Sequence, residues 1–433
     1  MYFIYSLIYT LAFLVLIPYF LVRELIYPRY WRSLFQRFGS IPREVNSNRK
    51  KSIWVHAVSV GEVLAAKSLI GALQKGYPDY PLVISTTTIT GNRIAQQIFP
   101  EVDGVVFFPF DWSFSIRRSL SRLNPVLLVI LETELWPNAL RQCKRRGIPV
   151  VLVNGRLSSR SYGRYLKIRT LFRRVLKDVD FYCMQSEEDA RRIISLGARQ
   201  DKVMATGNLK YDTDEPPASS KTTKLLSGLL GVKPETPVIV AGSTEKGEEE
   251  MMLTSFRKVK KKYPQAKMIL APRRPTRFDE VEKLLRSSSF CYRRRSKYGE
   301  EGGEPELLLL DTIGELTSAY ALGRINFVGG SLVPVGGHNI LEPASRGKPV
   351  VFGRYMDNFK AISQLFLKEE GGIMVKNQQE LTQAFLQLLE DDGLCARMGK
   401  KARQIVKANR GATDKSLAII QKLFPPSATG GAV

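Results

Sequence analysis

The chain has 433 residues, which is long enough for two domains that each bury a sizeable core. Its apolar content of 44% and charged content of 24% are those of an ordinary globular protein rather than of a disordered chain. The 65 basic and 41 acidic residues leave a net charge of +24, which favours an anionic partner such as nucleic acid, a membrane surface or a phosphorylated substrate.

The first predicted element is an apolar helix at the N-terminus. Residues 1–22 contain no charged residue, and about 20 apolar residues span the hydrocarbon core of a bilayer. No basic region precedes this run, which argues against a cleaved signal peptide. Basic and aromatic residues follow or flank it: Tyr19, Arg23, Tyr27, Arg29, Tyr30, Trp31, Arg32 and Arg37. The positive-inside rule then places the remaining chain in the cytoplasm.

We therefore predict a membrane anchor at residues 1–24. A buried N-terminal helix is the alternative. Pro18 and the short length of the apolar run also leave open a shallow insertion into the membrane interface.

Short apolar runs alternate with helix-length patterns through residues 40–212. The runs that read as strands are 53–57, 82–85, 105–108, 126–131, 150–153, 181–184 and 203–205. Repeated strand–helix units imply a parallel sheet covered on both faces. The sequence thus predicts a first Rossmann-like domain over residues 40–212.

Prolines and serines interrupt this alternation, and residues 213–236 are predicted to be a linker. The alternation resumes over residues 237–425, the predicted second Rossmann-like domain, which ends in C-terminal helices. Its expected strands are 238–241, 267–270, 307–310, 325–328 and 350–352. Residues 293–304 are charged and glycine-rich and are predicted to form a surface loop.

Polar residues of the first domain follow the ends of predicted strands. Glu62 lies where a helix begins after the first strand, a position that keeps a carboxylate ionised, as a general base requires. Glu132 and Glu134 follow a later strand, just before Pro137. Lys210 follows the last strand. Each acid could instead cap its helix, and the lysine could be a surface cation.

The second domain shows the same arrangement. Gly242-Ser243-Thr244 and Pro272-Arg273 end its first two strands, and Arg273 could pair with a phosphate or carboxylate. A glycine-rich stretch, residues 327–343, reads as strand, loop and a helix start at Asn339. Free backbone N–H groups there would form an anion site, although a tight βα turn explains the same pattern.

Residues 141–177 hold twelve lysines and arginines and no acid, which indicates an anionic partner: lipid phosphates, the membrane leaflet or, as the rival, nucleic acid. Asp178/Asp180 and Asp212/Asp214 have D-x-D spacing, but only two histidines occur, and we predict no metal. The four cysteines lack C-x-x-C spacing and the density of a disulfide scaffold, which indicates a reducing compartment.

Taken together, these motifs resemble the Kdo transferase family (3-deoxy-D-manno-octulosonic acid transferase, or lipid IVA Kdo transferase). The resemblance covers nearly the whole chain through eight ordered motifs: residues 56–62, 132–138, 154–161, 206–212, 242–249, 272–278, 311–316 and 327–343. It implies the α/β GT-B fold, in which two doubly wound Rossmann-like domains face a central cleft. An N-terminal anchor helix would be added to that fold.

The resemblance also implies an activity. An inverting, metal-independent enzyme would move Kdo from CMP-Kdo to the 6′-hydroxyl of the lipid A precursor, at the cytoplasmic side of the inner membrane. No cofactor and no nucleic acid would be needed. Glu62 matches the general base, and Glu132 and Lys210 match residues that stabilise the transition state. The CMP-binding positions would be Pro272, Arg273, Ile313, Gly314, Glu315, Asn339, Ile340, Leu341 and Glu342.

Two residues depart from the family pattern. Glu245 and Arg274 stand where the family commonly has histidine, and the two could pair with each other. Two rival functions remain: another GT-B transferase with a different nucleotide sugar and a lipid acceptor, and a basic, membrane-tethered nucleic-acid-binding protein.

Overall fold

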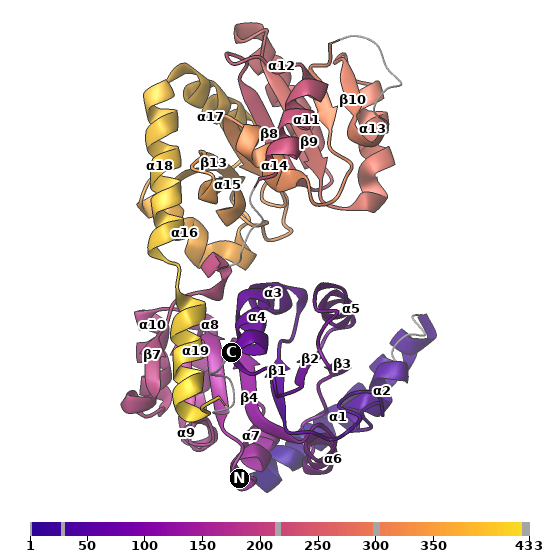
Figure 1. The fold of residues 1–433 in the computed structure, drawn as a ribbon, viewed down its shortest axis with the longest axis vertical. Helices are drawn as coiled ribbons and strands as arrows, with labels where there is room; N and C mark the ends of the chain where they lie inside the picture. The colour runs from indigo at the N-terminus through magenta and orange to yellow at the C-terminus, as the bar shows by residue number, and fades with distance from the viewer. Residues whose placement is uncertain (1, 27–30, 213–217, 298–303, 427–433) are drawn as a thin grey trace, which may run out of the picture. The chain divides into compact units, whose positions relative to one another are not determined.

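The chain folds into two compact α/β units (Figure 1). The computed structural model describes residues 2–26, 31–212, 218–297 and 304–426. Unit 1 consists of Met1–Thr213 and Arg410–Val433, and unit 2 consists of Asp214–Asn409.

The C-terminal boundary differs from the prediction, which assigned all of residues 237–425 to the second domain. Helix α19 (Ala412–Leu423) packs on α4 and β5 of unit 1. The Asp212 carboxylate accepts hydrogen bonds from the backbone N–H groups of Gly411 (2.7 Å) and Thr413 (2.5 Å), so the start of this helix is fixed to unit 1.

Unit 1 is built on a seven-stranded parallel sheet of order β3-β2-β1-β4-β5-β6-β7. The strands are β1 Ser52–His56, β2 Leu82–Thr86, β3 Gly104–Phe107, β4 Pro125–Leu131, β5 Val150–Gly155, β6 Phe181–Met184 and β7 Val203–Ala205. All seven predicted strands of the first half are confirmed. Alternate residues of each central strand enter different cores: Trp54 and Leu128 lie in one, Val55 and Val129 in the other. Both faces are therefore buried, which is why the strands are continuously apolar.

Helices cover both faces of this sheet. They are α1 Tyr2–Ile26, α2 Trp31–Arg37, α3 Val60–Ala65, α4 Lys67–Gly76, α5 Ile89–Ile98, α6 Ser113–Leu123, α7 Pro137–Arg145, α8 Ser159–Lys167, α9 Arg169–Leu176, α10 Glu187–Leu196 and α19.

Unit 2 repeats the architecture with the parallel strand order β10-β11-β9-β8-β12-β13-β14. Its strands are β8 Val238–Thr244, β9 Lys267–Pro272, β10 Tyr292–Arg294, β11 Leu307–Leu309, β12 Ile325–Val328, β13 Val350–Gly353 and β14 Gly372–Val375. Its helices are α11 Ser220–Leu230, α12 Glu248–Lys262, α13 Phe278–Arg286, α14 Leu316–Leu322, α15 Leu341–Ser345, α16 Lys360–Lys368, α17 Gln378–Glu390 and α18 Asp392–Ala408.

Two predictions for unit 2 need correction. Residues 220–230 of the predicted linker form the helix α11, whose N-cap Ser219 accepts a hydrogen bond from the N–H of Thr222. Residues 213–217 lie outside the described residues. The predicted surface loop at 293–304 begins as the edge strand β10, because its backbone pairs with β11 although its side chains are charged. Residues 298–303 lie outside the described residues.

The predicted membrane-spanning anchor is not supported. The apolar N-terminal run forms α1, but no helix among the described residues has the length and hydropathy needed to cross a membrane. One side of α1 packs on the rest of unit 1: the Tyr2 hydroxyl donates to Asp178 at 2.5 Å, and Trp112 donates to Thr10 at 2.9 Å. Tyr27, Arg29 and Tyr30 lie outside the described residues, as do the side chains of Tyr19, Arg23, Trp31 and Arg32.

Candidate active site

The three predicted catalytic residues of unit 1 all follow carboxyl ends of its parallel strands. Glu62 follows β1, Glu132 follows β4 directly and Lys210 follows β7. Because these ends share one edge of the sheet, the side chains gather there. The charges of Glu62 and Glu132 both act on Lys210, and the charge of Glu132 acts on Glu62. The structure therefore brings the three residues together.

Glu62 lies in the first turn of α3 and is only 8% exposed. Its carboxylate accepts hydrogen bonds from the Val58 N–H (2.7 Å) and the Ser59 hydroxyl (3.3 Å). Burial nevertheless raises the pKa of Glu62 to about 8, and the charges of Glu132 and Glu134 act in the same direction. The prediction that a helix start keeps this carboxylate ionised is wrong, because desolvation and like charges outweigh two hydrogen bonds.

Glu132 has a left-handed backbone conformation, with φ of +55°. Such a φ is costly for a residue with a side chain and persists where the surrounding structure imposes it. Here the Glu132 N–H donates to the carbonyl of Val153 (2.9 Å), and the next residue, Thr133, exchanges hydrogen bonds with the backbone of Arg156. The turn after β4 is thus fixed by β5, and it sets the direction of the Glu132 side chain.

Lys210 is held in place by a set of amide side chains that the sequence did not single out. Asn154 Oδ1 accepts the Leu209 N–H, and Asn208 Oδ1 accepts the Lys210 N–H, both at 3.0 Å. Gln185 bridges them: its side-chain amide donates to the Asn154 carbonyl, and its oxygen accepts from Asn208, both at 3.1 Å.

Burial lowers the pKa of Lys210, while the charge of Glu132 raises it. The sequence signal for this network is an asparagine or glutamine at three successive strand ends: Asn154, Gln185 and Asn208.

In unit 2 the predicted CMP-binding residues also follow carboxyl ends of neighbouring strands. Pro272 ends β9 and Arg273 follows it, with its N–H donated to the Thr244 carbonyl at 2.9 Å. The charge of Arg273 acts to lower the pKa of Glu342, which burial raises. Burial lowers the pKa of His338 to about 4, and Arg273 acts in the same direction, so His338 is neutral at pH 7. Arg273 thus lies close to the start of α15.

The segment after β11 lies next to the start of α15. Glu342 accepts a hydrogen bond from the hydroxyl of Thr317 in α14, and Glu315 precedes that helix. The Glu315 carboxylate binds Arg295 at 2.9 Å and also accepts from Thr312. Ile313 is 84% exposed, beside Gly314 with φ of +89°. The remaining CMP-binding candidates lie just before and within α15: Asn339, whose Oδ1 accepts the Leu341 N–H at 3.1 Å, and Ile340, which is buried.

The N–H groups of the glycine-rich loop after β12 bind a carboxylate of the chain itself, that of Glu248. The carboxylate of Glu248, which is fully buried, accepts hydrogen bonds from the N–H groups of Gly330 (2.7 Å), Ser331 (2.9 Å), Leu332 (2.8 Å) and Glu245 (2.9 Å). Burial raises the pKa of Glu248, and these four donors act to lower it.

The prediction that free N–H groups of this loop bind a ligand phosphate is therefore wrong for residues 330–332. Gly330 is required for a different reason: its φ is +66°, and a Cβ would lie 2.8 Å from the His338 ring.

The two departures from the family pattern contact each other. Arg274 Nε lies 3.3 Å from Glu245 Oε1, which confirms the predicted pair. His338 Nε2 lies 3.7 Å from the same oxygen. Glu245 is therefore shared by Arg274 and His338 at the carboxyl end of β8.

The D-x-D pairs have structural partners. Asp178 accepts from Tyr2, Asp180 pairs with Lys144 at 2.9 Å, and Asp212 binds the start of α19. Asp214 lies outside the described residues. Within the described parts of the chain, no three His, Cys, Asp or Glu side chains are grouped as a metal site would require. Metal independence stays a prediction.

Solved structures of other proteins identify the fold class. A UDP-GlcNAc 2-epimerase from Neisseria meningitidis is 16% identical with a TM-score of 0.57, and the match covers 86% of this chain and 99% of that chain. A glycosyltransferase from Rickettsia africae is 14% identical with a TM-score of 0.54, covering 87% and 100%. At these identities the likeness concerns the fold alone, and it shows that the chain has the GT-B fold.

Sequence comparisons identify the family. A family model described as 3-deoxy-D-manno-octulosonic-acid transferase (kdotransferase) matches residues 32–213. The 3-deoxy-D-manno-octulosonic acid transferase of Haemophilus influenzae is 34% identical over 395 residues, which are 91% of this chain and 92% of that protein. The enzyme of the same name from Bordetella pertussis is 31% identical over 89% of this chain and 90% of that protein. The chain belongs to the 3-deoxy-D-manno-octulosonic acid (Kdo) transferase family and is a glycosyltransferase.

Proposed function

We propose that this enzyme transfers Kdo from CMP-Kdo to the 6′-hydroxyl of the lipid A precursor (lipid IVA), with inversion at the sugar carbon. Membership of the Kdo transferase family supports the donor sugar. The observation that carries the mechanism is the position of Glu62, a buried carboxylate beside Glu132 and Lys210 at the carboxyl edge of the unit 1 sheet.

Glu62 would act as the general base. A base is most effective when its pKa lies near the working pH, and burial has raised the pKa of Glu62 to about 8. In its deprotonated form it would take the proton of the acceptor hydroxyl as that oxygen attacks the sugar carbon. Lys210 would favour this form, because an ammonium nearby stabilises the carboxylate. Glu132 would stabilise positive charge that develops on the sugar.

The edge of the unit 2 sheet would bind the donor. Arg273 is exposed and can pair with the phosphate of CMP, which becomes the leaving group. Glu342, held by Thr317, would accept hydrogen bonds from the ribose hydroxyls. Ile313, Gly314 and Glu315 would lie along the nucleotide, together with Asn339, Ile340 and Leu341. A guanidinium at the phosphate would perform the charge neutralisation for which other transferases use a metal ion.

We further propose that α1 attaches the enzyme to the cytoplasmic face of the inner membrane by lying in the interface. Its polar side chains face unit 1, where Tyr2, Ser6 and Thr10 all make hydrogen bonds. Its other side is apolar and exposed, at Phe3, Ile4, Leu7, Ile8, Leu11, Leu14 and Val15. A helix with an apolar side turned away from its own protein is suited to the boundary between headgroups and acyl chains.

Cations of the basic segment 141–177 lie near the start of α1. Arg141 stacks on the ring of Tyr2, with 4.1 Å from the guanidinium carbon to the ring centroid. Leu166 and Ile168 are exposed between basic residues at the junction of α8 and α9. We propose that this surface contacts the anionic leaflet or the phosphates of the acceptor.

A donor-specificity assay tests the proposed function. Purified protein in detergent is given tetra-acylated lipid A precursor and CMP-Kdo, CMP-sialic acid or a UDP-hexose, and released nucleotide and lipid mass are followed. We expect CMP release and a lipid that is heavier by one or more Kdo residues with CMP-Kdo only. Transfer from a UDP-hexose without transfer from CMP-Kdo would refute the proposal in favour of a different nucleotide-sugar transferase.

A further inference from the structure

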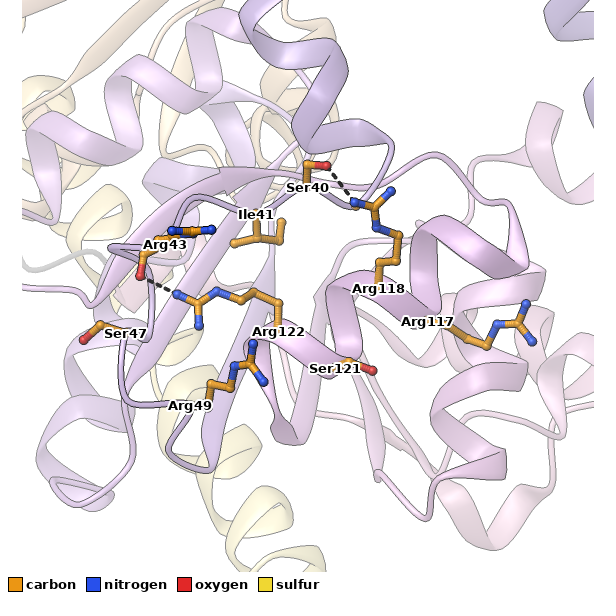
Figure 2. Close-up of a pocket in the computed structure, with 10 residues that line it drawn as sticks. Ser40, Ile41, Arg43, Ser47, Arg49, Arg117, Arg118, Ser121 and Arg122 are labelled. Carbon is orange, nitrogen blue, oxygen red and sulfur yellow. Dashed lines mark hydrogen bonds between the residues drawn. The ribbon is translucent and has the colours of Figure 1, made fainter.

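Unit 1 contains an arginine-lined cavity of about 930 Å³ that the proposed reaction does not use. It lies between the loop of residues 39–49 and the exposed side of α6 (Figure 2). Five arginines line it, together with serines and no carboxylate: Arg43, Arg49, Arg117, Arg118 and Arg122. In Figure 2 the guanidinium groups of Arg43, Arg49 and Arg122 lie on the same side of the cavity.

The cavity is distinct from the candidate active site. Its loop leads into the start of β1, and Asn124, which precedes β4, donates to the Arg49 carbonyl at 2.9 Å. The cavity therefore lies at the amino ends of β1 and β4, whereas Glu62 and Glu132 follow their carboxyl ends. Strands of five to seven residues separate the two edges by roughly 17–23 Å.

The arginines divide into those that hold the loop and those that remain available. Arg122 donates to the carbonyls of Pro42 (3.5 Å), Arg43 and Asn46 (3.3 Å), and so fixes the loop to α6. Arg118 donates to Ser40 at 3.1 Å. Among the residues that the structure describes, the guanidinium groups of Arg43, Arg49 and Arg117 have no hydrogen-bond or ion-pair partner.

These uncompensated charges indicate an anion with several acceptor oxygens. Like charges gathered around one cavity repel each other, and a bound phosphate would remove that repulsion while accepting forked hydrogen bonds from guanidinium groups. Glu44 neighbours Arg43 but does not line the cavity, and no ion pair to its carboxylate occurs within the described residues. The chain itself thus supplies no counter-charge among those residues.

An aromatic cluster connects α1 to the loop that lines the cavity. Phe13 of α1 packs on Trp112 (4.7 Å between ring centroids), and Trp112 stacks on Phe38 (5.7 Å), just before the cavity loop. Phe114, in the first turn of α6, is 46% exposed, and Phe35 of α2 is 68% exposed. An apolar helix and exposed aromatic rings beside a basic cavity match the depth order of acyl chains and lipid phosphates in a leaflet.

We propose that this cavity binds the phosphate group of an anionic phospholipid headgroup, while α1 lies in the membrane interface. The proposal rests on the interfacial placement of α1 made above. It assigns the headgroup contacts to Arg43 and Arg49, whose guanidinium groups lie on the same side of the cavity in Figure 2. Arg117 adds a further positive charge to the lining, and Arg122 positions the loop.

Calorimetric titration of the full chain with dihexanoyl phosphatidylglycerol below its micelle concentration tests this proposal. A triple variant, Arg43→Gln/Arg49→Gln/Arg117→Gln, leaves Arg122 and hence the loop in place. The matched control, Lys258→Gln/Lys261→Gln/Lys400→Gln, removes three exposed cations of α12 and α18 in unit 2, none of which belongs to a surface proposed to contact the membrane. We expect saturable binding by the wild type and the control, and about ten- to hundred-fold weaker binding by the cavity variant, since each basic contact strengthens headgroup binding. Equal loss in both triple variants would mean diffuse attraction and would overturn the proposal.

Inorganic phosphate is the second probe, because a free phosphate offers the same chemistry. Phosphatidylglycerol is expected to bind the wild type in 10 mM phosphate about as well as in phosphate-free buffer. Saturable phosphate binding that abolishes lipid binding would overturn the lipid assignment in favour of a soluble phosphate compound. Circular dichroism and thermal unfolding verify that the cavity variant is folded. No sugar donor is present, so the outcome is independent of whether the chain transfers Kdo.

Discussion

At the scale of single residues, the protonation of Glu62 decides when the candidate base can act. The sequence places Glu62 at a strand end and a helix start, and that placement was correct. The predicted charge state was not, because it depends on burial and on Glu132 and Glu134, which are distant in sequence. A carboxylate with a pKa of about 8 is mostly protonated in the free enzyme at pH 7.

The pH dependence of transfer follows from this pKa. Only deprotonated Glu62 can accept a proton, so kcat/KM should rise about tenfold per pH unit below pH 8 and level off above it. Glu132→Gln removes a like charge and should shift this rise to lower pH, whatever it does to the maximal rate. The measurement is a pH profile of initial rates from pH 5.5 to 9.5. An unshifted rise in the Glu132→Gln profile would show that another group controls it.

Glu248 is the residue that sequence reasoning missed in the glycine-rich loop. A Glu248→Gln amide offers one oxygen where the carboxylate accepts four N–H donors with two, so buried donors lose their partner. Each loss costs about 1–3 kcal/mol, and we expect unit 2 to melt several degrees lower and to bind CMP-Kdo more weakly.

Glu250→Gln is the control for that substitution, because Glu250 lies in the same helix turn and is exposed. Differential scanning calorimetry and donor titration compare the two variants. If Glu248→Gln and Glu250→Gln have the same melting temperature, Glu248 does not organise the loop.

At the scale of elements, α1 shows what an apolar pattern can and cannot predict. The run without charges correctly predicted a helix that has a surface to bury. It did not predict orientation, because tyrosine, serine and threonine count as weakly apolar or neutral while their hydroxyl groups bind Asp178, Asn138 and Trp112. The stripe of hydroxyl side chains at positions 2, 6 and 10 was the available signal.

The exposed side of α1 gives a direct test of membrane attachment. Leu7→Gln/Leu11→Gln changes two side chains that are 50% and 54% exposed, so unit 1 should keep its melting temperature. Partition into phospholipid vesicles should fall about tenfold or more, because each leucine contributes on the order of 1–2 kcal/mol when it enters the interface. The control is Leu225→Gln/Leu367→Gln, two leucines of unit 2 that are each 37% exposed. Vesicle flotation of the α1 variant at the wild-type level would contradict the proposed attachment.

The predicted phosphate site in the loop after β12 was wrong for a related reason. Glycines indicate where a backbone can turn, and the loop after β12 does turn at its glycines. They do not indicate which anion binds the N–H groups that the turn leaves available. That partner, Glu248, lies 82 residues before Gly330 and reaches the loop because β8 and β12 are neighbours in the sheet.

At the scale of the whole molecule, the alternation of apolar runs and helical patterns was enough to predict two parallel α/β units. The edge strands β10 and β14 were missed, because β10 is charged and β14 has only three consecutive apolar residues after its glycine. The return of α19 to unit 1 was also missed. The amphipathic pattern of α19 predicts that the helix packs on a core, but it does not predict which unit supplies that core. The contacts with Asp212 and α4 place it on unit 1.

The central claim is that a Kdo transferase active site depends on Glu62. The most direct test is mass spectrometry of the lipid product, with wild type and Glu62→Gln supplied with CMP-Kdo and tetra-acylated lipid A precursor at pH 8, alongside calorimetric titration of CMP. We predict a Kdo-bearing product from the wild type and a rate lowered by about 10²–10⁴-fold in Glu62→Gln, with CMP affinity retained. Near-normal transfer by Glu62→Gln would contradict the account.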